Sequence, residues 1–205
     1  MWGVEDFNAE KRTSYFITLN TVDWVDVFIR PVYKQVIVHT LNHFIDSKGL
    51  AVYAWSLMTN HLHLLVQSRP GFEFSETIHQ FGNFTNQKIL EALETEPGSR
   101  REWMLARFQQ FYGSAKDLSI WQNTGKRILV DMEDIAKLVD YIEYIHENPV
   151  RDRFVDVASD YPYSSARDYC GQKGLVHITR LPEIEQLLSA ADGFANLFAT
   201  RHTRS

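Results

Sequence analysis

The sequence has little cysteine and no long apolar run. Cys170 is the only cysteine among 205 residues, so no disulfide can form within one chain, and the composition fits a reducing compartment. No stretch approaches the roughly 20 apolar residues that a membrane-spanning helix needs. The first residues, Met1–Lys11, lack the basic start and apolar stretch of a secretory signal peptide. We therefore expect a cytoplasmic protein with no membrane association.

An excess of positive charge is also missing. The formal net charge is −5, which on its face argues against nucleic acid as a partner. The charges are unevenly distributed, however, and residues 99–130 carry six basic against two acidic side chains. The basic residues are Arg100, Arg101, Arg107, Lys116, Lys126 and Arg127. This segment is either a local basic surface or an ordinary solvated face, and the composition leaves both open.

The hydrophobic pattern predicts alternating strands and helices. Hydrophobic residues make up 44% of the chain, which argues against disorder. Runs rich in β-branched and aromatic residues predict strands at Ser14–Val22, Leu50–Leu57 and His61–Gln67. Apolar residues three and four apart predict helices at Val32–Asp46, Ser75–Leu93 and Arg101–Phe111.

The remaining elements complete the predicted fold. Ser119–Val130 is interpreted as a hairpin about the turn at residues 123–125. A last long helix is expected from Asp131 or Asp134 to about Asn148, where Pro149 helps to end it. This order implies the α+β class, with helices packed on an antiparallel sheet of ferredoxin-like order. We expect one domain over residues 1–205, with a core at about 14–155 and a C-terminal tail at 156–205.

Two histidines separated by a single leucine begin the third predicted strand. Residues two apart in a strand point to the same face of the sheet, so His61 and His63 share one face and Leu62 and Leu64 the other. Same-facing imidazoles beside an apolar run are costly to bury and are good ligands for divalent cations. A structural or surface role fits the same pattern, and the pair alone does not decide.

A second polar group lies on the helix that precedes Pro149. Tyr144 and Asn148 are four residues apart and Tyr141 and Tyr144 three, so their side chains lie near one helical face. Beside two histidines, such a face has the parts for phosphodiester chemistry. The amide completes the shell of a metal ion, and a tyrosine hydroxyl attacks phosphorus. Packing roles for both tyrosines explain the pattern as well.

Three motifs in a fixed order resemble a known family. They are Asn60-His61-Leu62-His63 after a strand, YIHENPVR at residues 144–151 and DYPYSSA at residues 160–166. Together they resemble the REP-associated tyrosine transposases, which are single-tyrosine transposases of the HUH type related to the transposases of the smallest bacterial insertion sequences. The resemblance covers about residues 14–176, including Phe81–Lys88.

The resemblance implies a ferredoxin-like HUH endonuclease that nicks and rejoins single-stranded DNA near hairpins such as REP-like elements. It implies that His61, His63 and Asn148 bind Mg²⁺ or Mn²⁺. Tyr144 would be the catalytic nucleophile, forming a 5′-phosphotyrosine link and leaving a free 3′-hydroxyl, with Tyr141 as the competitor one turn earlier. A homodimer is expected, associated with the nucleoid in a bacterial cytoplasm.

Some features depart from the family pattern. The chain is acidic where relatives are often basic, Gly82 stands where similar relatives tend to have lysine, and Glu147 adds negative charge beside Asn148. Two alternatives therefore stay open. One is a catalytically weakened or domesticated protein that binds DNA hairpins, and the other is a metal-dependent phosphodiesterase that uses water.

Further residues are candidates for contacts with DNA. Arg151 and Arg153 flank the end of the tyrosine helix and are the best placed to neutralise phosphates. Trp121, in the predicted hairpin, can stack on an unpaired base, although packing in the core or within the hairpin is the favoured role.

Overall fold

A four-stranded antiparallel sheet forms the centre of the computed structural model, which describes residues 13–95, 99–112, 118–122, 126–184 and 186. The strands are β1 (Thr13–Asn20), β2 (Leu50–Leu57), β3 (His61–Ser68) and β4 (Lys126–Asp131), in the order β2-β3-β1-β4. All neighbouring strands are antiparallel. The predicted α+β class with ferredoxin-like strand order is confirmed.

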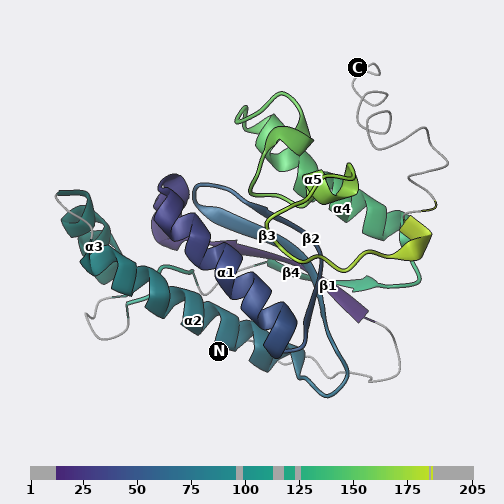
Figure 1. Cartoon of the computed structure of the whole chain (residues 1–205). Helices are drawn as coiled ribbons and strands as arrows, with labels where there is room; N and C mark the ends of the chain where they lie inside the picture. Colours follow the sequence, from purple (N-terminus) through teal and green to yellow (C-terminus); the bar gives the residue numbers. More distant parts are fainter. Residues whose placement is uncertain (1–12, 96–98, 113–117, 123–125, 185, 187–205) are drawn as a thin grey trace.

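Helices cover both faces of the sheet (Figure 1). α1 (Pro31–Ser47) and α2 (Phe74–Glu94) lie on one face, and α4 (Ile135–Arg151) lies on the other. α3 (Ser99–Tyr112) follows α2, and the short 3₁₀ turns η1 (Val22–Trp24) and η2 (Val27–Ile29) link β1 to α1. The tail adds η3 (Ala158–Asp160) and α5 (Ala166–Tyr169).

Side-chain alternation along the central strands creates two hydrophobic cores. Leu62 and Leu64 of β3 are fully buried on the face of α1 and α2, whereas Leu65 is fully buried on the face of α4. Each such side chain contributes roughly 1.5–3 kcal/mol of hydrophobic stabilisation. Because His61 and His63 have the same parity as Leu65, β3 directs both imidazoles toward α4.

The segment Ser119–Val130 pairs differently from the prediction. Its second arm forms β4, but β4 pairs with β1, with Ile17 opposite Arg127. The first arm contributes an isolated bridge between Trp121 and Thr21, just beyond β1. The predicted hairpin pairing was therefore wrong, because the edge of β1 provides backbone partners for both arms. The predicted turn at 123–125 lies outside the described residues.

α4 runs further than predicted. It continues to Arg151, with Pro149 inside its last turn. A proline removes only its own N–H from the helical ladder, and the next turn still closes because Asp152 N donates to Asn148 O at 3.0 Å. The extra turn carries Arg151 past Asn148 and onto the side of Tyr144.

The C-terminal tail packs along the outer edge of β2. Leu57 N donates to Tyr163 O at 2.9 Å, and Ser165 N donates to Trp55 O at 3.0 Å. A covered edge strand has fewer exposed backbone groups for pairing with another chain. The tail also returns from the end of α4, so it joins that helix to the sheet.

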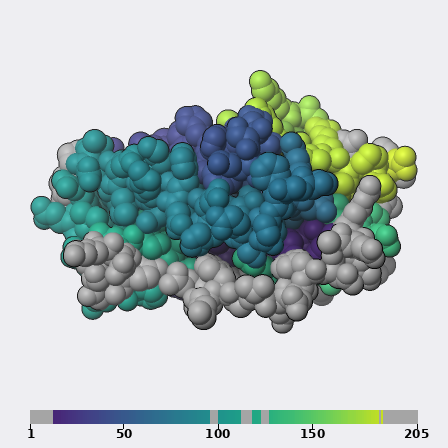
Figure 2. Space-filling model, turned by 90° about the horizontal axis from the view of Figure 1, so that it is seen from below, coloured from purple at the N-terminus to yellow at the C-terminus, as the bar shows by residue number. Residues whose placement is uncertain are grey.

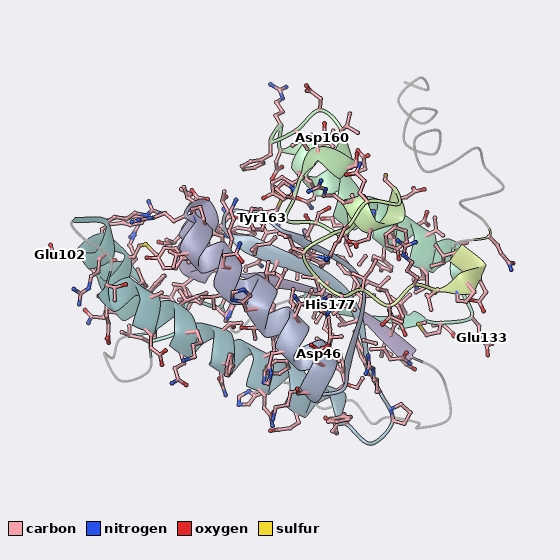
Figure 3. The ribbon with its side chains drawn as sticks, viewed as in Figure 1. Asp46, Glu102, Glu133, Asp160, Tyr163 and His177 are labelled. Carbon is pink, nitrogen blue, oxygen red and sulfur yellow. The ribbon has the colours of Figure 1, made fainter. Side chains whose placement is uncertain are left out.

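Two contacts fix the tail to α1, and Figure 3 labels their residues in the tail. Lys34 Nζ lies 4.4 Å from the ring centroid of Tyr163. Further along, His177 Nδ1 lies 3.8 Å from Asp46 Oδ1 near the C-terminal end of α1. The tail therefore contacts both the sheet and the helix layer.

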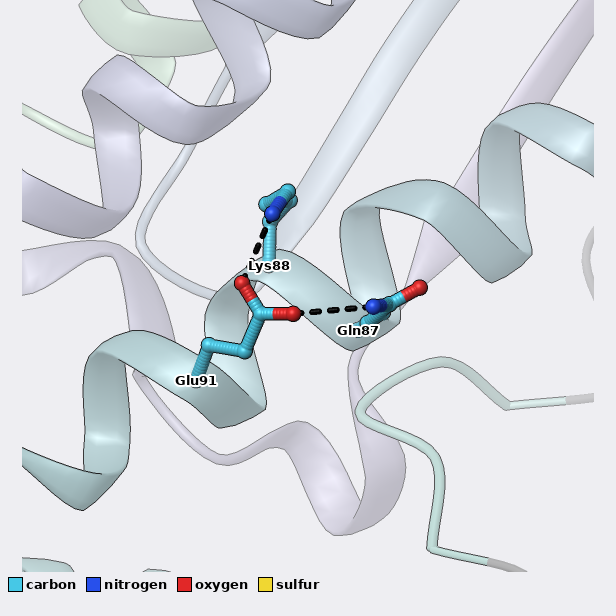
Figure 4. A network of polar contacts seen from close by, with 3 residues as sticks. All are labelled: Gln87, Lys88 and Glu91. Atoms are coloured by element: carbon cyan, nitrogen blue, oxygen red, sulfur yellow. Dashed lines mark hydrogen bonds and ion pairs between the residues drawn. The ribbon is translucent and has the colours of Figure 1, made fainter.

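α2 runs across the face of the molecule that Figure 2 shows. On it, Lys88 Nζ lies 2.7 Å from Glu91 Oε2, and Gln87 Nε2 donates to Glu91 Oε1 at 2.8 Å (Figure 4). Lys88 belongs to the segment Phe81–Lys88 of the family resemblance, yet here it pairs within its own helix. Such an exposed pair contributes only about 0.2–0.5 kcal/mol. Across the described residues, no helix combines the length and apolarity that crossing a membrane takes.

Candidate active site

The four site residues singled out from the sequence line one cavity of about 430 Å³. The cavity lies between the sheet, η1 and the last turns of α4. Its lining consists of Thr18, Asn20, Trp24, His61, His63, Tyr144, Asn148, Arg151 and Asp152. The fold therefore brings together the histidines of β3 and the tyrosine and amide of α4.

β3 places the two imidazoles side by side, with ring centroids 4.7 Å apart. Thr18, opposite His63 in β1, has its Oγ1 atom 2.9 Å from His63 Nδ1. Asn60 Oδ1 lies 2.8 Å from His61 Nδ1. When each Nδ1 carries the proton, as an oxygen partner allows, each Nε2 keeps the lone pair that metal binding requires.

Burial keeps both histidines neutral. The pKa of His63 is lowered to about 3, chiefly by burial and then by the neighbouring His61 and Arg151. Burial also lowers the pKa of His61, while its hydrogen bond with Asn148 and the carboxylate of Asp152 act in the opposite direction. Neutral imidazole is the form that binds metal ions. The pair is therefore in the ligand form at neutral pH.

α4 holds the tyrosine in place because its apolar stripe packs on the sheet. The stripe consists of Leu138, Ile142 and Ile145, which are buried in the core between α4 and the sheet. Asp134 caps the helix, and its Oδ1 atom accepts from Lys137 N at 3.1 Å. A cap of this kind stabilises a helix by about 1 kcal/mol.

Tyr144 faces the histidines from α4. Its ring centroid lies 5.3 Å from that of His63, with the planes at 74°. Arg151 lies over the Tyr144 ring, with its Cζ atom 4.5 Å from the centroid, and its Nη2 atom donates to Tyr144 O at 3.0 Å. Tyr144 is 40% exposed, whereas Asn148, one turn later, is buried. The ring, the amide and the guanidinium therefore open on the same cavity.

Tyr141 occupies a different environment from Tyr144. Its ring stacks on Phe16, with centroids 4.7 Å apart, and packs against the core beneath α4. It is not among the residues that line the cavity. Of these two tyrosines, Tyr144 is therefore the one that opens on the cavity with the histidines.

The donor set at the cavity is two imidazoles and an amide. Within the part of the chain that the structure describes, no three His, Cys, Asp or Glu side chains are grouped to hold a metal ion. The Asn148 amide is the further polar group beside His61. Imidazole and carbonyl oxygen are suitable ligands for divalent ions, so the residues present fit the expected cofactor.

The residues considered for contacts with DNA lie in different environments. Arg151 lines the cavity and Arg153, beyond the helix end, does not. Trp121 is buried, and its Nε1 atom donates to Thr85 Oγ1 at 2.8 Å, so the favoured packing role is confirmed. Arg127 and Trp121 border a second cavity of about 560 Å³ between α2 and the β1–β4 edge.

Part of the basic segment 99–130 has structural partners. Arg100 Nη2 donates to Asp26 O at 2.6 Å, and Arg107 Nη2 lies 3.2 Å from Asp23 Oδ2. Both contacts hold the turns between β1 and α1. Lys116 and the side chain of Lys126 lie outside the described residues.

Four of the cavity residues were not found from the sequence, namely Thr18, Asn20, Trp24 and Asp152. Asp152 is four residues after Asn148, just as Asn148 is four residues after Tyr144. The same helical spacing could therefore have indicated Asp152. Thr18 and Asn20 oppose the histidines only through the β1–β3 register, which the sequence does not give.

Comparisons with known proteins identify a family for this chain. The profile of a family described as "Transposase IS200 like" matches residues 13–118, just over half of the chain. The chain belongs to the IS200-like transposase family. The matched region includes the histidines of β3, whereas Tyr144 on α4 lies beyond it.

This transposase has similar proteins among the REP-associated tyrosine transposases. It is 28% identical over 158 residues to a putative REP-associated tyrosine transposase of Haemophilus influenzae, a match that covers 76% of this chain and 74% of that protein. Its fold resembles that of a REP-associated tyrosine transposase solved bound to a REP hairpin. The TM-score is 0.58 at 16% identity, and the match covers 89% of this chain and 96% of the other. The resemblance that the three motifs indicated is confirmed.

Proposed function

We propose that this transposase nicks and rejoins single-stranded DNA near hairpins, with Tyr144 as the nucleophile. The observation that carries the proposal is the cavity in which Tyr144, His61, His63 and Asn148 meet. Tyr144 is the tyrosine of α4 that combines exposure with a position beside the histidines. An accessible hydroxyl next to a metal-ligand set is the arrangement that covalent phosphodiester transfer needs.

The neutral histidines and the amide would hold Mg²⁺ or Mn²⁺. Such an ion, when bound, would polarise a phosphate oxygen and stabilise the negative charge that develops there. Thr18 and Asn60 would orient the imidazoles through their Nδ1 atoms.

Tyr144 would attack the scissile phosphorus, forming a phosphorus–oxygen bond as the bond to the 3′ oxygen breaks. The products are a 5′-phosphotyrosine and a free 3′-hydroxyl, so the proton lost by the phenol is balanced by the proton gained by the 3′ oxygen. The phosphodiester count is unchanged, and the reverse reaction rejoins DNA without an external energy source. Arg151, over the Tyr144 ring, is placed to neutralise a phosphate.

The proposed DNA partner is a hairpin with single-stranded flanks. The support is the fold shared with a transposase solved in complex with a REP hairpin. We also propose association with the nucleoid, as the place of such DNA, and a homodimer in solution.

A covalent-trapping assay tests the proposal. Wild type, Tyr144→Phe, Tyr141→Phe and His61→Ala are incubated with labelled hairpin DNAs carrying randomised single-stranded flanks, in Mn²⁺ or EDTA. We expect a denaturation-resistant adduct in wild type and Tyr141→Phe with Mn²⁺, and none otherwise. Cleavage that survives Tyr144→Phe without an adduct would indicate a water-using phosphodiesterase. Binding without cleavage would indicate a hairpin-binding protein that lacks catalysis.

A further inference from the structure

An exposed tryptophan stands at the edge of the proposed active site. Trp24, in η1, is 56% exposed, and it lines the same cavity as His61 and Tyr144. Its ring centroid lies 6.3 Å from that of His61, with the planes at 75°. The half-exposed indole offers an aromatic face to the cavity beside His61 and Tyr144.

The backbone of η1 is strained at this residue. Asp23 and Trp24 are consecutive non-glycine residues in the left-handed region, with φ of 51° and 55°. Such conformations persist only where the surroundings enforce them, and they gather at functional sites. Here Val22 and Val25, on either side of this pair, are buried in the core, and both side chains between them are exposed.

A contact across the turn and a contact with α3 hold this conformation. Thr21 Oγ1 donates to Val25 O at 2.8 Å across the turn, and Arg107 of α3 pairs with Asp23 at 3.2 Å. Both contacts restrain the turn that carries the indole. They favour a rigid platform over a side chain that moves freely.

Asn60 connects the platform to the proposed metal site. Its Nδ2 atom donates to Trp24 O at 3.4 Å, and its Oδ1 atom lies 2.8 Å from His61 Nδ1. One amide therefore contacts both the turn that carries the indole and the ring of His61.

We propose that Trp24 is a stacking platform for an unpaired base of the nucleotide next to the scissile phosphate. This inference rests on the proposed function and names a DNA-binding residue for it. Every base offers a π-face, so an indole accepts any sequence at this position. On α4 at the same cavity, Arg151 supplies the positive charge that the phosphate of that nucleotide requires. Base and phosphate would thus be held at two points around Tyr144.

The expected effect on binding is large enough to measure. Stacking of one base on an aromatic side chain is worth about 1–3 kcal/mol, which corresponds to a factor of about 5 to 150 in Kd. We expect Trp24→Ala to weaken binding of a hairpin DNA with single-stranded thymidine flanks within this range. Trp24→Phe, which keeps an aromatic face, should retain most of the affinity.

Binding is measured by fluorescence anisotropy in EDTA, so it does not depend on catalysis. Trp103→Ala is the matched control, because Trp103 is 48% exposed but does not line the cavity. In parallel, 5-iodouracil replaces the flanking thymines, and photocrosslinked peptides are identified by mass spectrometry. We expect crosslinks at Trp24 and an affinity loss in Trp24→Ala alone.

The outcomes separate this inference from the proposed function. Unchanged affinity in Trp24→Ala, an equal loss in Trp103→Ala, or crosslinks at other aromatic residues alone would overturn the stacking role. Absence of binding by wild type would overturn it as well. If the DNA binds and crosslinks at Trp24 but no Tyr144 adduct forms with Mn²⁺, the stacking role stands and the proposed nuclease function fails.

Discussion

Arg151 holds Tyr144 twice, since its guanidinium lies 4.5 Å from the centre of the tyrosine ring and donates a hydrogen bond to the tyrosine's own carbonyl. The two residues are seven apart, two turns of α4, so the contact depends on the helix continuing through Pro149. It fixes the ring beside His63 and brings a positive charge to the place where a phosphate would lie.

Arg151→Ala is predicted to slow adduct formation by about 100-fold at saturating DNA, because the tyrosine ring loses its restraint and a small misplacement of a nucleophile has a large effect on rate. The salt dependence of DNA binding should also fall by about one unit of slope, as one phosphate contact is lost. Single-turnover kinetics and a salt titration measure these effects. Arg153→Ala, beyond the cavity, is the control, and an equal loss there would contradict the assigned position of Arg151.

Thr18→Val is predicted to weaken Mn²⁺ binding by about 10- to 100-fold, since the isosteric valine removes the oxygen that orients His63 through Nδ1. The β-branched replacement suits a strand, so the fold should be retained. Isothermal titration calorimetry measures the affinity. Thr95→Val, at the end of α2, should bind Mn²⁺ as wild type does. Equal affinities for all three proteins would mean that Thr18 has no part in a metal site.

Ser165→Ala is predicted to lower the free energy of unfolding by about 1–3 kcal/mol, because buried polar groups lose their partner. Ser165 Oγ lies 2.7 Å from Nε2 of His146, which is fully buried in α4, and it accepts from Trp55 N at 3.0 Å. The bond connects α4, the tail and β2. Urea denaturation checks the change against exposed Ser47→Ala, and an equal effect of both substitutions would argue against the connection.

Stability of the metal-free protein is predicted to fall as the pH is lowered below about 6.5. The pKa values of His63 and His146 are each lowered to about 3, chiefly by burial. Between about pH 6.5 and pH 3 the unfolded chain therefore binds more protons than the folded one, and each histidine can contribute up to about 1.4 kcal/mol per pH unit.

Urea unfolding in EDTA at about pH 7 and about pH 5.5 measures this linkage. His63→Asn should show a smaller drop than wild type, because it removes one of the two histidines whose pKa burial lowers to about 3. A wild-type stability that does not change over this range would mean that the histidines are not held neutral by burial.

The sequence was sufficient to predict those parts of the site that depend on the side-chain periodicity of a single strand or helix. The strand period of two put His61 and His63 on one face, and the helical period put Tyr144 and Asn148 on one side of α4. Each pair needed only its own element, and the structure brings both pairs to one cavity. Their chemical roles stay predictions until they are measured.

The features that were missed depend on partners distant in sequence. β4 has the composition of a hairpin arm, yet its partner is β1, because strand pairing is decided by the available edge and not by local pattern. The turn that carries Trp24 makes contacts with Asn60 and Arg107. Both residues are far from the tryptophan in sequence, so the local pattern around Trp24 could not indicate them. Tertiary context, and not propensity, sets both.

The most direct test of the central claim is to locate the covalent link to DNA. After reaction with the hairpin DNA in Mn²⁺ and nuclease trimming, trypsin should release the peptide Leu138–Arg151, which contains both Tyr141 and Tyr144. Tandem mass spectrometry then assigns the modified tyrosine. The account predicts a nucleotide attached through its 5′ phosphate to Tyr144. A nucleotide on Tyr141, or cleaved DNA with no modified tyrosine, would contradict it.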